Sequence, residues 1–283
     1  MWVYDTTTMG RGGSSWCILK GEVVLNDFSL IIHKLSRELQ QIKIYPVADL
    51  HVGAEEFLAK AWEAFRKKLL SEPDSYIGID GDMVNNAIKS SVSNVYAETM
   101  RPREQKRWLA DQLAPVRDKI LFAIPGNHEY RSDKEVDDNP LYDVCCKLDI
   151  EHLYRENAAF VKISLGNKAN GKPVVYTLCA MHGSGGGIYT GATVNRSERF
   201  SQYIDGLDIM MTGHTHKGVV SKPKKLVIDP YNNQVTFRDV AVVGCTSWLE
   251  YGGYALKQML QPASNDPQTL VLDGTKKHVE IRW

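Results

Sequence analysis

From residue 41 onward, short apolar runs alternate with segments of helical periodicity, and this alternation limits the folds open to the chain. The first runs, read as strands, cover residues 42–48, 76–80 and 119–124. The helical segments between them cover residues 54–70 and 104–117. Later strands are expected at 160–165, 174–181, 207–211, 218–228, 234–243 and 278–282, with helices at 139–148 and 197–204. Strand–helix alternation followed by hairpins predicts an α/β (or α+β) fold of two packed sheets flanked by helices.

Two parts of the chain are harder to interpret. Pro46 lies inside the first strand, and because proline cannot donate a hydrogen bond, this strand is expected to be irregular or at a sheet edge. Residues 1–40 begin with a stretch rich in Gly, Ser and Thr, and 30–39 are compatible with a helix. The chain has no internal repeat and no low-complexity linker. We therefore expect one domain over residues 41–283 and an N-terminal extension over residues 1–40, to which we assign no role.

The charged residues balance, with 34 Lys and Arg against 34 Asp and Glu. A net charge of zero gives no overall attraction to nucleic acid or to a membrane, although it leaves room for a local basic groove. The polar N-terminus lacks the apolar stretch of a secretory signal, and no apolar run is long enough to span a bilayer. The five cysteines, an odd number without metal-ligand spacing, favour free thiols in a reduced compartment. We therefore expect a cytoplasmic protein without a membrane partner.

Side chains that can bind metals follow five of the expected strands. The motifs are Asp49-Leu50-His51, Gly81-Asp82, Gly126-Asn127-His128-Glu129, Met181-His182-Gly183 and Gly213-His214-Thr215-His216. Open α/β sheets place their sites where loops leave the carboxyl ends of strands, and residues two apart in an extended segment share a face. Any one motif is better explained by a helix cap, a tight turn or a loop histidine. Together they carry more weight, because five of the eight histidines lie at strand ends beside Asp, Asn or Gly.

In this order the motifs resemble the calcineurin-like metallophosphoesterase superfamily, and the resemblance covers roughly residues 41–243. It implies a four-layer αββα fold, in which a sandwich of two β-sheets carries helices on both outer faces. It also implies an enzyme, a metal-dependent phosphoesterase that hydrolyses phosphate esters.

Carried over position by position, the resemblance implies two divalent metal ions. The first would be held by Asp49, His51, Asp82 and His216, and the second by Asp82, Asn127, His182 and His214. Mixed oxygen and nitrogen ligands favour manganese, with iron, zinc and nickel as alternatives. A water shared by the two ions would attack phosphorus as hydroxide. His128 would be the catalytic general acid that protonates the departing oxygen.

The substrate class is narrowed by the residues that follow Asp82. The serine/threonine phosphatases of the superfamily continue Gly-Asp-x-x-Asp-Arg, whereas this chain has Asn85 and Asn86 at the last two positions. Asn85 can accept a hydrogen bond from His128 but carries no charge, and Asn86 cannot clamp a phosphate as arginine does. We therefore expect a phosphodiesterase that acts on a nucleotide or, as a nuclease, on nucleic acid. Asn85, Asn86 and Arg131 are the candidate substrate contacts.

Three other functions are compatible with metal-binding side chains of this kind. A phosphomonoesterase acting on a small metabolite would use the same metal ligands. A non-catalytic metal-binding scaffold is disfavoured, because no metal-ligand position is missing. A structural zinc site closes with four ligands and favours cysteine, and none of the five cysteines lies in the motifs. The oligomeric state stays open, with a homodimer as one option.

Overall fold

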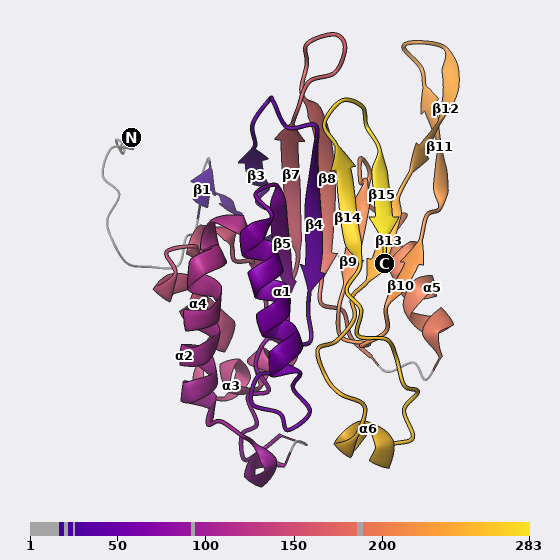
Figure 1. Cartoon of the computed structure of the whole chain (residues 1–283). Helices are drawn as coiled ribbons and strands as arrows, with labels where there is room; N and C mark the ends of the chain where they lie inside the picture. The colour runs from indigo at the N-terminus through magenta and orange to yellow at the C-terminus, as the bar shows by residue number, and fades with distance from the viewer. Residues whose placement is uncertain (1–16, 20–21, 25, 92–93, 186–188) are drawn as a thin grey trace.

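The computed structural model describes residues 17–19, 22–24, 26–91, 94–185 and 189–283, and its centre is a pair of β-sheets packed face to face (Figure 1). The six-stranded sheet has the order β10-β13-β9-β8-β7-β3, and the five-stranded sheet the order β15-β14-β4-β5-β6. The six-stranded sheet comprises β3 (Ile31–Lys34), β7 (Ala159–Leu165), β8 (Val174–Met181), β9 (Ile209–Thr212), β10 (Val219–Ser221) and β13 (Ala241–Gly244). The five-stranded sheet comprises β4 (Gln41–Val47), β5 (Ser75–Asp80), β6 (Ile120–Ile124), β14 (Thr269–Asp273) and β15 (Val279–Arg282).

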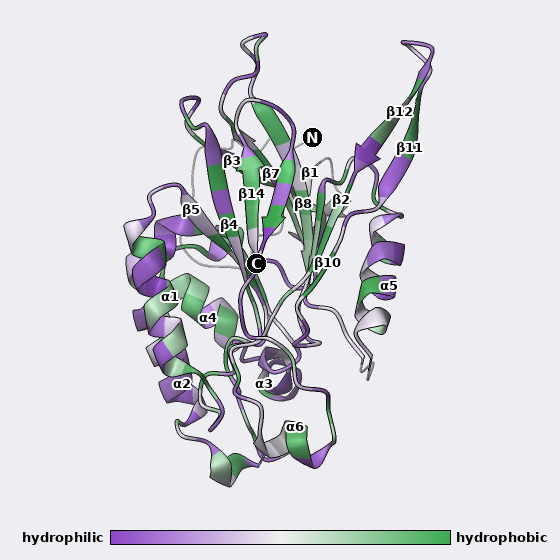
Figure 2. Cartoon of the chain, turned by 45° about the vertical axis from the view of Figure 1, so that its right-hand side comes forward, coloured by the Kyte–Doolittle hydropathy of each residue, from purple (hydrophilic) through white to green (hydrophobic). Residues whose placement is uncertain are grey.

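Helices flank both sheets. On the side of the five-stranded sheet lie α1 (Ala59–Ser71), α2 (Pro102–Leu113) and α4 (Pro140–Lys147), whereas α5 (Thr190–Ser201) contacts β9, β10 and β13 (Figure 1). The buried residues of α1 are Trp62, Phe65 and Leu69, which share one helix face, and Phe65 packs edge-on against Tyr45 of β4 at 5.3 Å between ring centres. The helices are hydrophilic mainly on their outer sides (Figure 2). This arrangement confirms the expected sandwich of two sheets flanked by helices.

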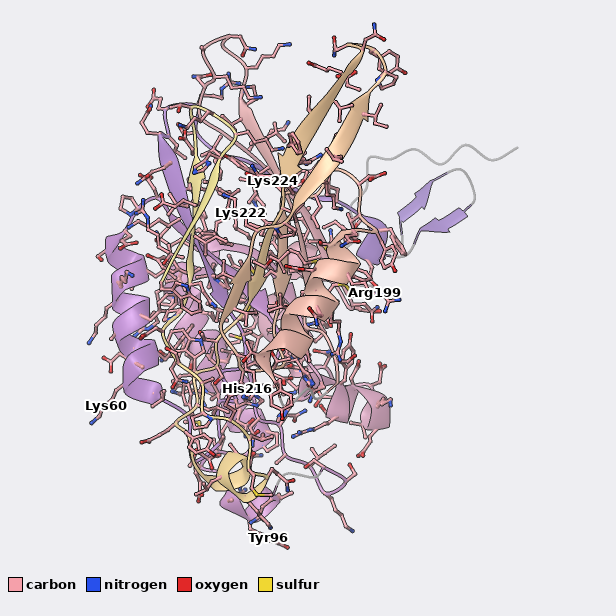
Figure 3. All side chains as sticks on the ribbon, turned by 90° about the vertical axis from the view of Figure 1, so that its right-hand side faces the viewer. Lys60, Tyr96, Arg199, His216, Lys222 and Lys224 are labelled. Carbon is pink, nitrogen blue, oxygen red and sulfur yellow. The ribbon has the colours of Figure 1, made fainter. Side chains whose placement is uncertain are left out.

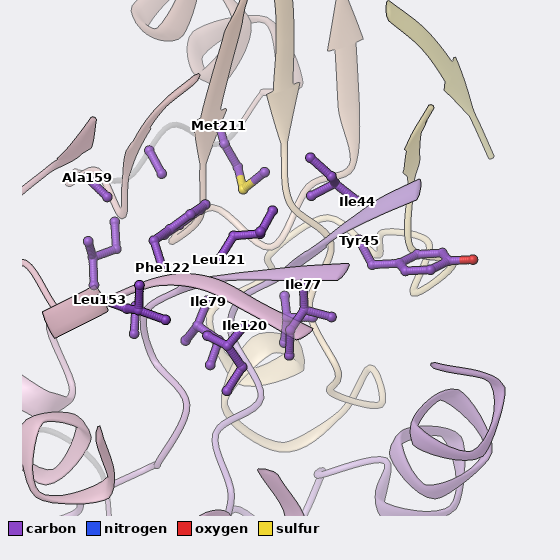
Figure 4. Packing of buried hydrophobic residues seen from close by; sticks show 14 of the residues in the cluster. Ile44, Tyr45, Ile77, Ile79, Ile120, Leu121, Phe122, Leu153, Ala159 and Met211 are labelled. Atoms are coloured by element: carbon purple, nitrogen blue, oxygen red, sulfur yellow. The ribbon is translucent and has the colours of Figure 1, made fainter. Parts of the chain in front are cut away.

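Side chains that point to alternate faces of the strands fill the space between the two sheets. On β9, Ile209 and Met211 belong to the main core together with Ile44 of β4, whereas Met210 packs with Cys179 and Val242 in a smaller cluster. Figure 4 shows Met211 and Ile44 among the packed side chains of this core. Neighbouring residues of a strand point to opposite faces, so the two clusters lie on the two faces of the six-stranded sheet. Burial of each large apolar side chain stabilises the sandwich by about 1.5–3 kcal/mol.

Of the two alternatives expected at Pro46, an irregular strand or a sheet edge, the sheet edge is wrong. β4 lies in the middle of the five-stranded sheet, between β14 and β5. Its pairing with β14 ends at Ile44, opposite Leu270, whereas its pairing with β5 continues to Val47. Pro46 therefore lies beyond the β14 ladder, where a missing N–H group costs that ladder no hydrogen bond.

A helix over residues 30–39 is also wrong, because this segment contains β3. β3 pairs in parallel with β7, with Ile31 opposite Val161. The segment before it is held by hydrogen bonds from Arg155 Nε to Ser29 O (3.3 Å) and from the Asn157 main chain to Asp27 Oδ1 (3.0 Å). Residues 31–34 of the expected N-terminal extension therefore lie inside the sandwich, whereas residues 1–16 lie outside the described residues. β1 (Cys17–Leu19) and β2 (Glu22–Val24) pair antiparallel.

Other boundaries differ from the sequence expectation. α1 begins at Ala59 instead of residue 54, and α5 begins at Thr190 instead of residue 197. The two late strand runs each divide, so that β11 (Lys224–Asp229) and β12 (Gln234–Asp239) leave the large sheet as a separate hairpin (Figure 1). β14 was not expected. In the described residues, no helix has both the length and the apolar character needed to cross a membrane.

Candidate metal centre

The five motifs meet at one end of the sandwich, where strands of both sheets end. β4, β5 and β6 run parallel to one another, and so do β8 and β9. Main-chain hydrogen bonds join the segments that follow: Asp49 N donates to Gly81 O at 3.0 Å and His51 N to Asp82 O at 2.9 Å. His216 marks this end of the molecule in Figure 3, in which α6 (Gly253–Lys257) lies beyond it. Parallel strands thus deliver their motifs to one place.

Five motif residues other than glycine adopt a left-handed backbone conformation. The φ angles are 53° at Asp49, 49° at His51, 50° at Asp82, 69° at His214 and 56° at His216. This conformation costs a residue with a Cβ atom about 1–2 kcal/mol. Strained backbone of this kind gathers at functional sites, where the surrounding structure holds it in place. The side chains are therefore presented by tight turns beyond the strands and not by extended chain.

Two motif glycines are required by the closeness of neighbouring atoms. A Cβ atom on Gly126 would lie 2.2 Å from Asp82 Oδ1, and one on Gly213 would lie 2.9 Å from His182 Nδ1. Neither contact leaves room for a methyl group. These glycines therefore let the exits of β6 and β9 approach the side chains that the other strands supply.

Asp49, His51 and His216 form the first group of side chains that could hold a metal ion. Asp49 Oδ1 lies 3.3 Å from His216 Nε2 and 3.8 Å from His51 Nε2, and the two Nε2 atoms are 3.1 Å apart. Ligand atoms bound to one ion by bonds of about 2.1 Å lie roughly 3–3.5 Å apart. The spacing of this group therefore fits a single ion.

Asp82, His182 and His214 form the second group, and a third set of close ligand atoms, from His51, Asp82 and His128, links it to the first. Asp82 Oδ2 lies 3.3 Å from His182 Nε2, and His214 Nδ1 lies 2.7 Å from Asn127 Oδ1, which brings the amide of Asn127 to this group. Asp82 Oδ2 also lies 3.8 Å from His51 Nε2 of the first group. The Asp82 carboxylate is therefore placed between the two groups.

Hydrogen bonds hold one atom of three of these side chains and leave another atom turned into the site. His182 Nδ1 lies 2.6 Å from the main-chain oxygen of Asp80, Asp82 Oδ1 accepts from His128 N at 2.8 Å, and Asp49 Oδ2 accepts from His214 N at 3.0 Å. Within the described residues, the buried atoms Asp49 Oδ1 and His182 Nε2 make no well-directed hydrogen bond, although His216 Nε2 and Asp82 Oδ2 each lie 3.3 Å from one of them. Buried polar atoms are rarely left unpaired, and both atoms would be satisfied by a metal ion. The residues therefore fit a metal.

The electrostatics of the site favour a cation. Burial raises the pKa of Asp82, but the attraction of His182, His128 and His51 outweighs burial and holds that pKa well below its usual value. Burial lowers the pKa of His182, but Asp82 and Asp49 outweigh burial and raise it well above its usual value. Burial, with His128 acting in the same direction, holds the pKa of His51 well below 6.5. Asp82 and His51 are thus held in the ionised and neutral forms that bind metals, whereas at His182 a metal ion would replace the proton that Asp82 and Asp49 favour.

His128 lies beside Asp82, and hydrogen bonds fix its ring. Its Nδ1 atom lies 2.8 Å from the main-chain oxygen of Asn85, and its Nε2 atom lies 2.8 Å from a guanidinium nitrogen of Arg131. Because a carbonyl oxygen only accepts, Nδ1 carries the proton and Nε2 accepts from Arg131. Burial lowers the pKa of His128 to about 4, with Arg131 adding to the effect against the attraction of Asp82. His128 is therefore a neutral imidazole in this structure.

The expected substrate contacts differ in their surroundings. The Asn85 side chain donates to Glu98, so only its main-chain oxygen serves His128. Asn86 is buried, and its amide nitrogen donates to His128 O and Ser132 Oγ, both at 2.9 Å. Arg131 is partly buried and donates to the same Asn85 oxygen at 3.0 Å. Arg131 is the only charged residue of the three, and its guanidinium lies beside the ring of His128.

Glu129 was part of a motif but received no role from the sequence. Its buried carboxylate accepts four main-chain N–H groups, at distances between 2.7 and 3.1 Å. The donors are Asp82, Met83, Val84 and Gly126. Glu129 therefore joins the loops that follow β5 and β6. Its place beside three motif residues in the sequence was the only available signal.

Comparison with known proteins agrees with this site. The model of the calcineurin-like phosphoesterase family matches residues 42–218, which is more than half of the chain. No curated protein sequence matches significantly. Among solved structures, a conserved uncharacterised protein from Streptococcus pneumoniae TIGR4, described as a predicted phosphoesterase, is 10% identical, with a TM-score of 0.38 over 86% of this chain and 90% of that chain. A likeness of that degree carries no argument. The family match does, and the chain belongs to the calcineurin-like phosphoesterases, which are metal-dependent phosphoester hydrolases.

Proposed function

We propose that the chain is a phosphodiesterase with two metal ions, and that its substrate is a nucleotide or nucleic-acid diester. One observation carries the proposal: the Asp82 carboxylate lies between two groups of ligand atoms, 3.8 Å from His51 Nε2 and 3.3 Å from His182 Nε2. A single buried carboxylate between two imidazole-rich groups suits a bridging ligand. When bound, the ions supply an activated water and neutralise charge on the phosphoryl oxygens.

The ligand sets that we propose follow the two groups. Asp49, His51, Asp82 and His216 would hold one ion, and the set around the other would be Asp82, Asn127, His182 and His214. Carboxylate, amide and imidazole ligands without a thiolate favour manganese, with iron, zinc and nickel as alternatives. The unpartnered atoms Asp49 Oδ1 and His182 Nε2 support this assignment, since each set contains one of them.

Two residues are proposed to act on the substrate. The bond between His128 Nδ1 and Asn85 O keeps one proton on Nδ1 and holds the ring. To act as the general acid, Nε2 would first take up a second proton from solvent and then give it to the departing oxygen. Arg131 would contact a phosphoryl oxygen, because its guanidinium already lies at that Nε2 atom. A diester carries one negative charge on its phosphate, which one guanidinium matches. Asn85 and Asn86, which are engaged within the protein, add no positive charge, and this favours a diester over a dianionic monoester.

The proposal is tested by comparing two chromogenic substrates. Metal-stripped protein is reloaded with manganese and assayed with bis-p-nitrophenyl phosphate, a diester, and with p-nitrophenyl phosphate, a monoester. Asp82→Asn removes the proposed bridging ligand, and Asp118→Asn is the matched control, because the Asp118 side chain is 92% exposed. We expect manganese-dependent diester cleavage that Asp82→Asn abolishes and Asp118→Asn leaves intact.

The other outcomes separate the alternatives. Cleavage of the monoester alone would replace the diesterase by a phosphomonoesterase of small metabolites. Inactivity on both substrates with two ions bound would favour a non-catalytic scaffold. A chain that binds no metal would contradict the ligand assignment itself.

A further inference from the structure

A cavity lies at the opposite end of the six-stranded sheet from the candidate metal centre. Its volume is about 500 Å³, and its lining includes Asp208, Lys222, Lys224, Arg238, Asp239 and Lys277. Asp208 immediately precedes β9, whereas His214 follows β9 at its other end. An extended chain rises about 3.3 Å per residue, so the six steps from Asp208 to His214 separate the two places by roughly 20 Å. Lys222 and Lys224 lie near the base of the β11–β12 hairpin in Figure 3, well apart from His216.

Asp208 is the buried acid of this cavity, with 3% of its surface exposed. Arg238 Nη2 lies 2.9 Å from Asp208 Oδ1, and Lys277 Nζ lies 2.8 Å from Asp208 Oδ2. The main-chain N–H of Thr177 also donates to Asp208 Oδ2, at 2.8 Å. One carboxylate is thus shared by two cations, and the pair of cations exceeds it by one positive charge.

The two lysines at the base of the hairpin add to this excess. Lys224 pairs with Asp239 at 3.8 Å, and both side chains are largely exposed, so the pair is weak. Lys222 Nζ donates to the main-chain oxygen of Val279 at 2.8 Å, and its charge also attracts the Glu280 carboxylate, which lies outside the lining. The lining therefore has four cationic side chains against two carboxylates, an excess of two positive charges in a chain whose net charge is zero.

Two further features bear on the ligand of this cavity: an aromatic ring and an unpaired hydrogen-bond donor. Phe237 lines the cavity, and 70% of its surface is exposed beside the cations. Arg238 Nε is buried and, within the described residues, has no hydrogen-bond partner. An exposed aromatic ring can stack on a nucleobase, and clustered lysine and arginine side chains bind phosphate oxygens.

We propose that this cavity is a second binding site, separate from the metal centre, for a phosphate group attached to a nucleobase. Lys222 and Lys224 would contact the phosphate, and Phe237 would stack on the base. The same chemistry is presented by a free nucleotide and by one unit of a nucleic-acid strand. The site requires neither the metal ions nor the diesterase reaction.

Binding to metal-free protein tests this site. The probes are inorganic phosphate and adenosine 5′-monophosphate, measured by calorimetry, and a short fluorescein-labelled oligothymidylate, measured by anisotropy. The variants are Lys222→Glu with Lys224→Glu, and Phe237→Ala; Lys60→Glu, an exposed position on α1, is the matched charge control. Loss of a charged phosphate contact weakens binding by about tenfold or more. We therefore expect the double variant to bind at least one base-bearing probe about tenfold more weakly, and Lys60→Glu to bind it as the unchanged protein does.

The outcomes identify the ligand or overturn the site. Weaker binding of the mononucleotide, with Phe237→Ala reducing mononucleotide but not phosphate affinity, assigns a free nucleotide. Weaker binding of the oligonucleotide alone assigns a strand. Equal affinities for all three probes in the double variant and the unchanged protein overturn the site, provided that circular dichroism shows both are folded. If the double variant unfolds, Lys222→Gln with Lys224→Gln takes its place.

Diester hydrolysis distinguishes this proposal from the proposed function. Lys222 and Lys224 lie outside the metal centre, so the double variant should cleave bis-p-nitrophenyl phosphate at the unchanged rate. If the unchanged protein does not cleave the diester, the proposed function is contradicted, but the binding results still test the second site.

Discussion

The ring of His182 is held by the main chain of Asp80, with 2.6 Å between His182 Nδ1 and the Asp80 carbonyl oxygen. The carbonyl oxygen can only accept, so Nδ1 carries the proton and Nε2 faces Asp82 Oδ2 at 3.3 Å. Metal-binding histidines commonly use one ring nitrogen to fix the other in this way. Asp80 therefore orients His182 through its backbone, which no side-chain motif could reveal.

Replacing His182 should empty one side of the centre. We expect His182→Ala to bind about one ion per chain instead of two and to lose diester hydrolysis by about 100-fold or more, since the proposed set keeps only its oxygen ligands and His214. Bound metal is counted by mass spectrometry of the loaded protein, and rates are measured with bis-p-nitrophenyl phosphate. His152→Ala, at an exposed histidine, is the control. Two tightly bound ions in His182→Ala would contradict the assignment.

A methyl group at Gly126 should disturb the centre although no ligand residue is replaced. In Gly126→Ala the new Cβ atom would meet Asp82 Oδ1 at 2.2 Å, so Asp82 must move. We expect metal affinity to fall at least about tenfold. Titration with manganese, followed by calorimetry, measures this change. Gly191→Ala is the control, because no atom lies within 4 Å of its Cβ position and α5 tolerates alanine better than glycine. Equal affinities in the two variants would show that the β6 exit is not tightly packed.

Glu129→Gln should lower the stability of the folded protein, because Glu129 joins two loops through hydrogen bonds. Each carboxylate oxygen accepts two main-chain N–H groups, and the glutamine amide nitrogen cannot accept any. One pair of buried donors is then left unpaired, at about 1–3 kcal/mol each. We expect the free energy of unfolding of the metal-free protein to fall by about 2–6 kcal/mol. Urea unfolding measures it, with exposed Glu151→Gln as the control. A change below about 0.5 kcal/mol would contradict this role.

His33 should make stability depend on pH. Burial lowers the pKa of His33 below 6.5, with His152 acting in the same direction against the hydrogen bond to Leu121 O. The folded state therefore disfavours the protonated ring. Its contribution to stability is complete above the unfolded-state pKa of about 6.5 and is lost as the pH falls below that value.

His33→Gln isolates this contribution, because glutamine keeps a donor for Leu121 O but does not titrate. We expect the free energy of unfolding to fall less between about pH 7 and pH 5 in His33→Gln than in the unchanged protein. Urea unfolding at several pH values measures both slopes. Exposed His278→Gln should retain the original slope. Parallel slopes for His33→Gln and the unchanged protein would rule His33 out as the source.

Several elements could be expected from the residues alone, and others could not. β4, β5 and β6 are short apolar runs bounded by polar segments, so their own composition indicates them. β3 was misread as part of a helix, because it gains its conformation by pairing with β7, about 130 residues further along the chain. β14 escaped detection, although it pairs with β4 on one side and β15 on the other. Pairing with distant strands leaves little trace in a local sequence.

In the candidate site, too, the sequence indicates some features and leaves others to the tertiary structure. Asp49-x-His51 and His214-x-His216 have the same spacing, yet Asp49 and His51 share one group, whereas His214 and His216 belong to different groups. The left-handed turns at these residues decide where each side chain points. Asn85 is a second example. The sequence predicts a hydrogen bond between its side chain and His128, whereas in the structure the bond is made by its main-chain oxygen.

The sequence by itself determined which residues stand at the strand ends and that glycines accompany them, because strand length and glycine placement are local properties of the chain. Only the tertiary structure decided which of these residues are neighbours, and that Glu129 and Asp80 hold them in place. It also brought Asp208, Lys222, Lys224 and Lys277 to one cavity. Each of these relationships joins elements far apart in the sequence, and their geometry is set by the packing of two sheets and by buried hydrogen bonds that no short pattern of residues records.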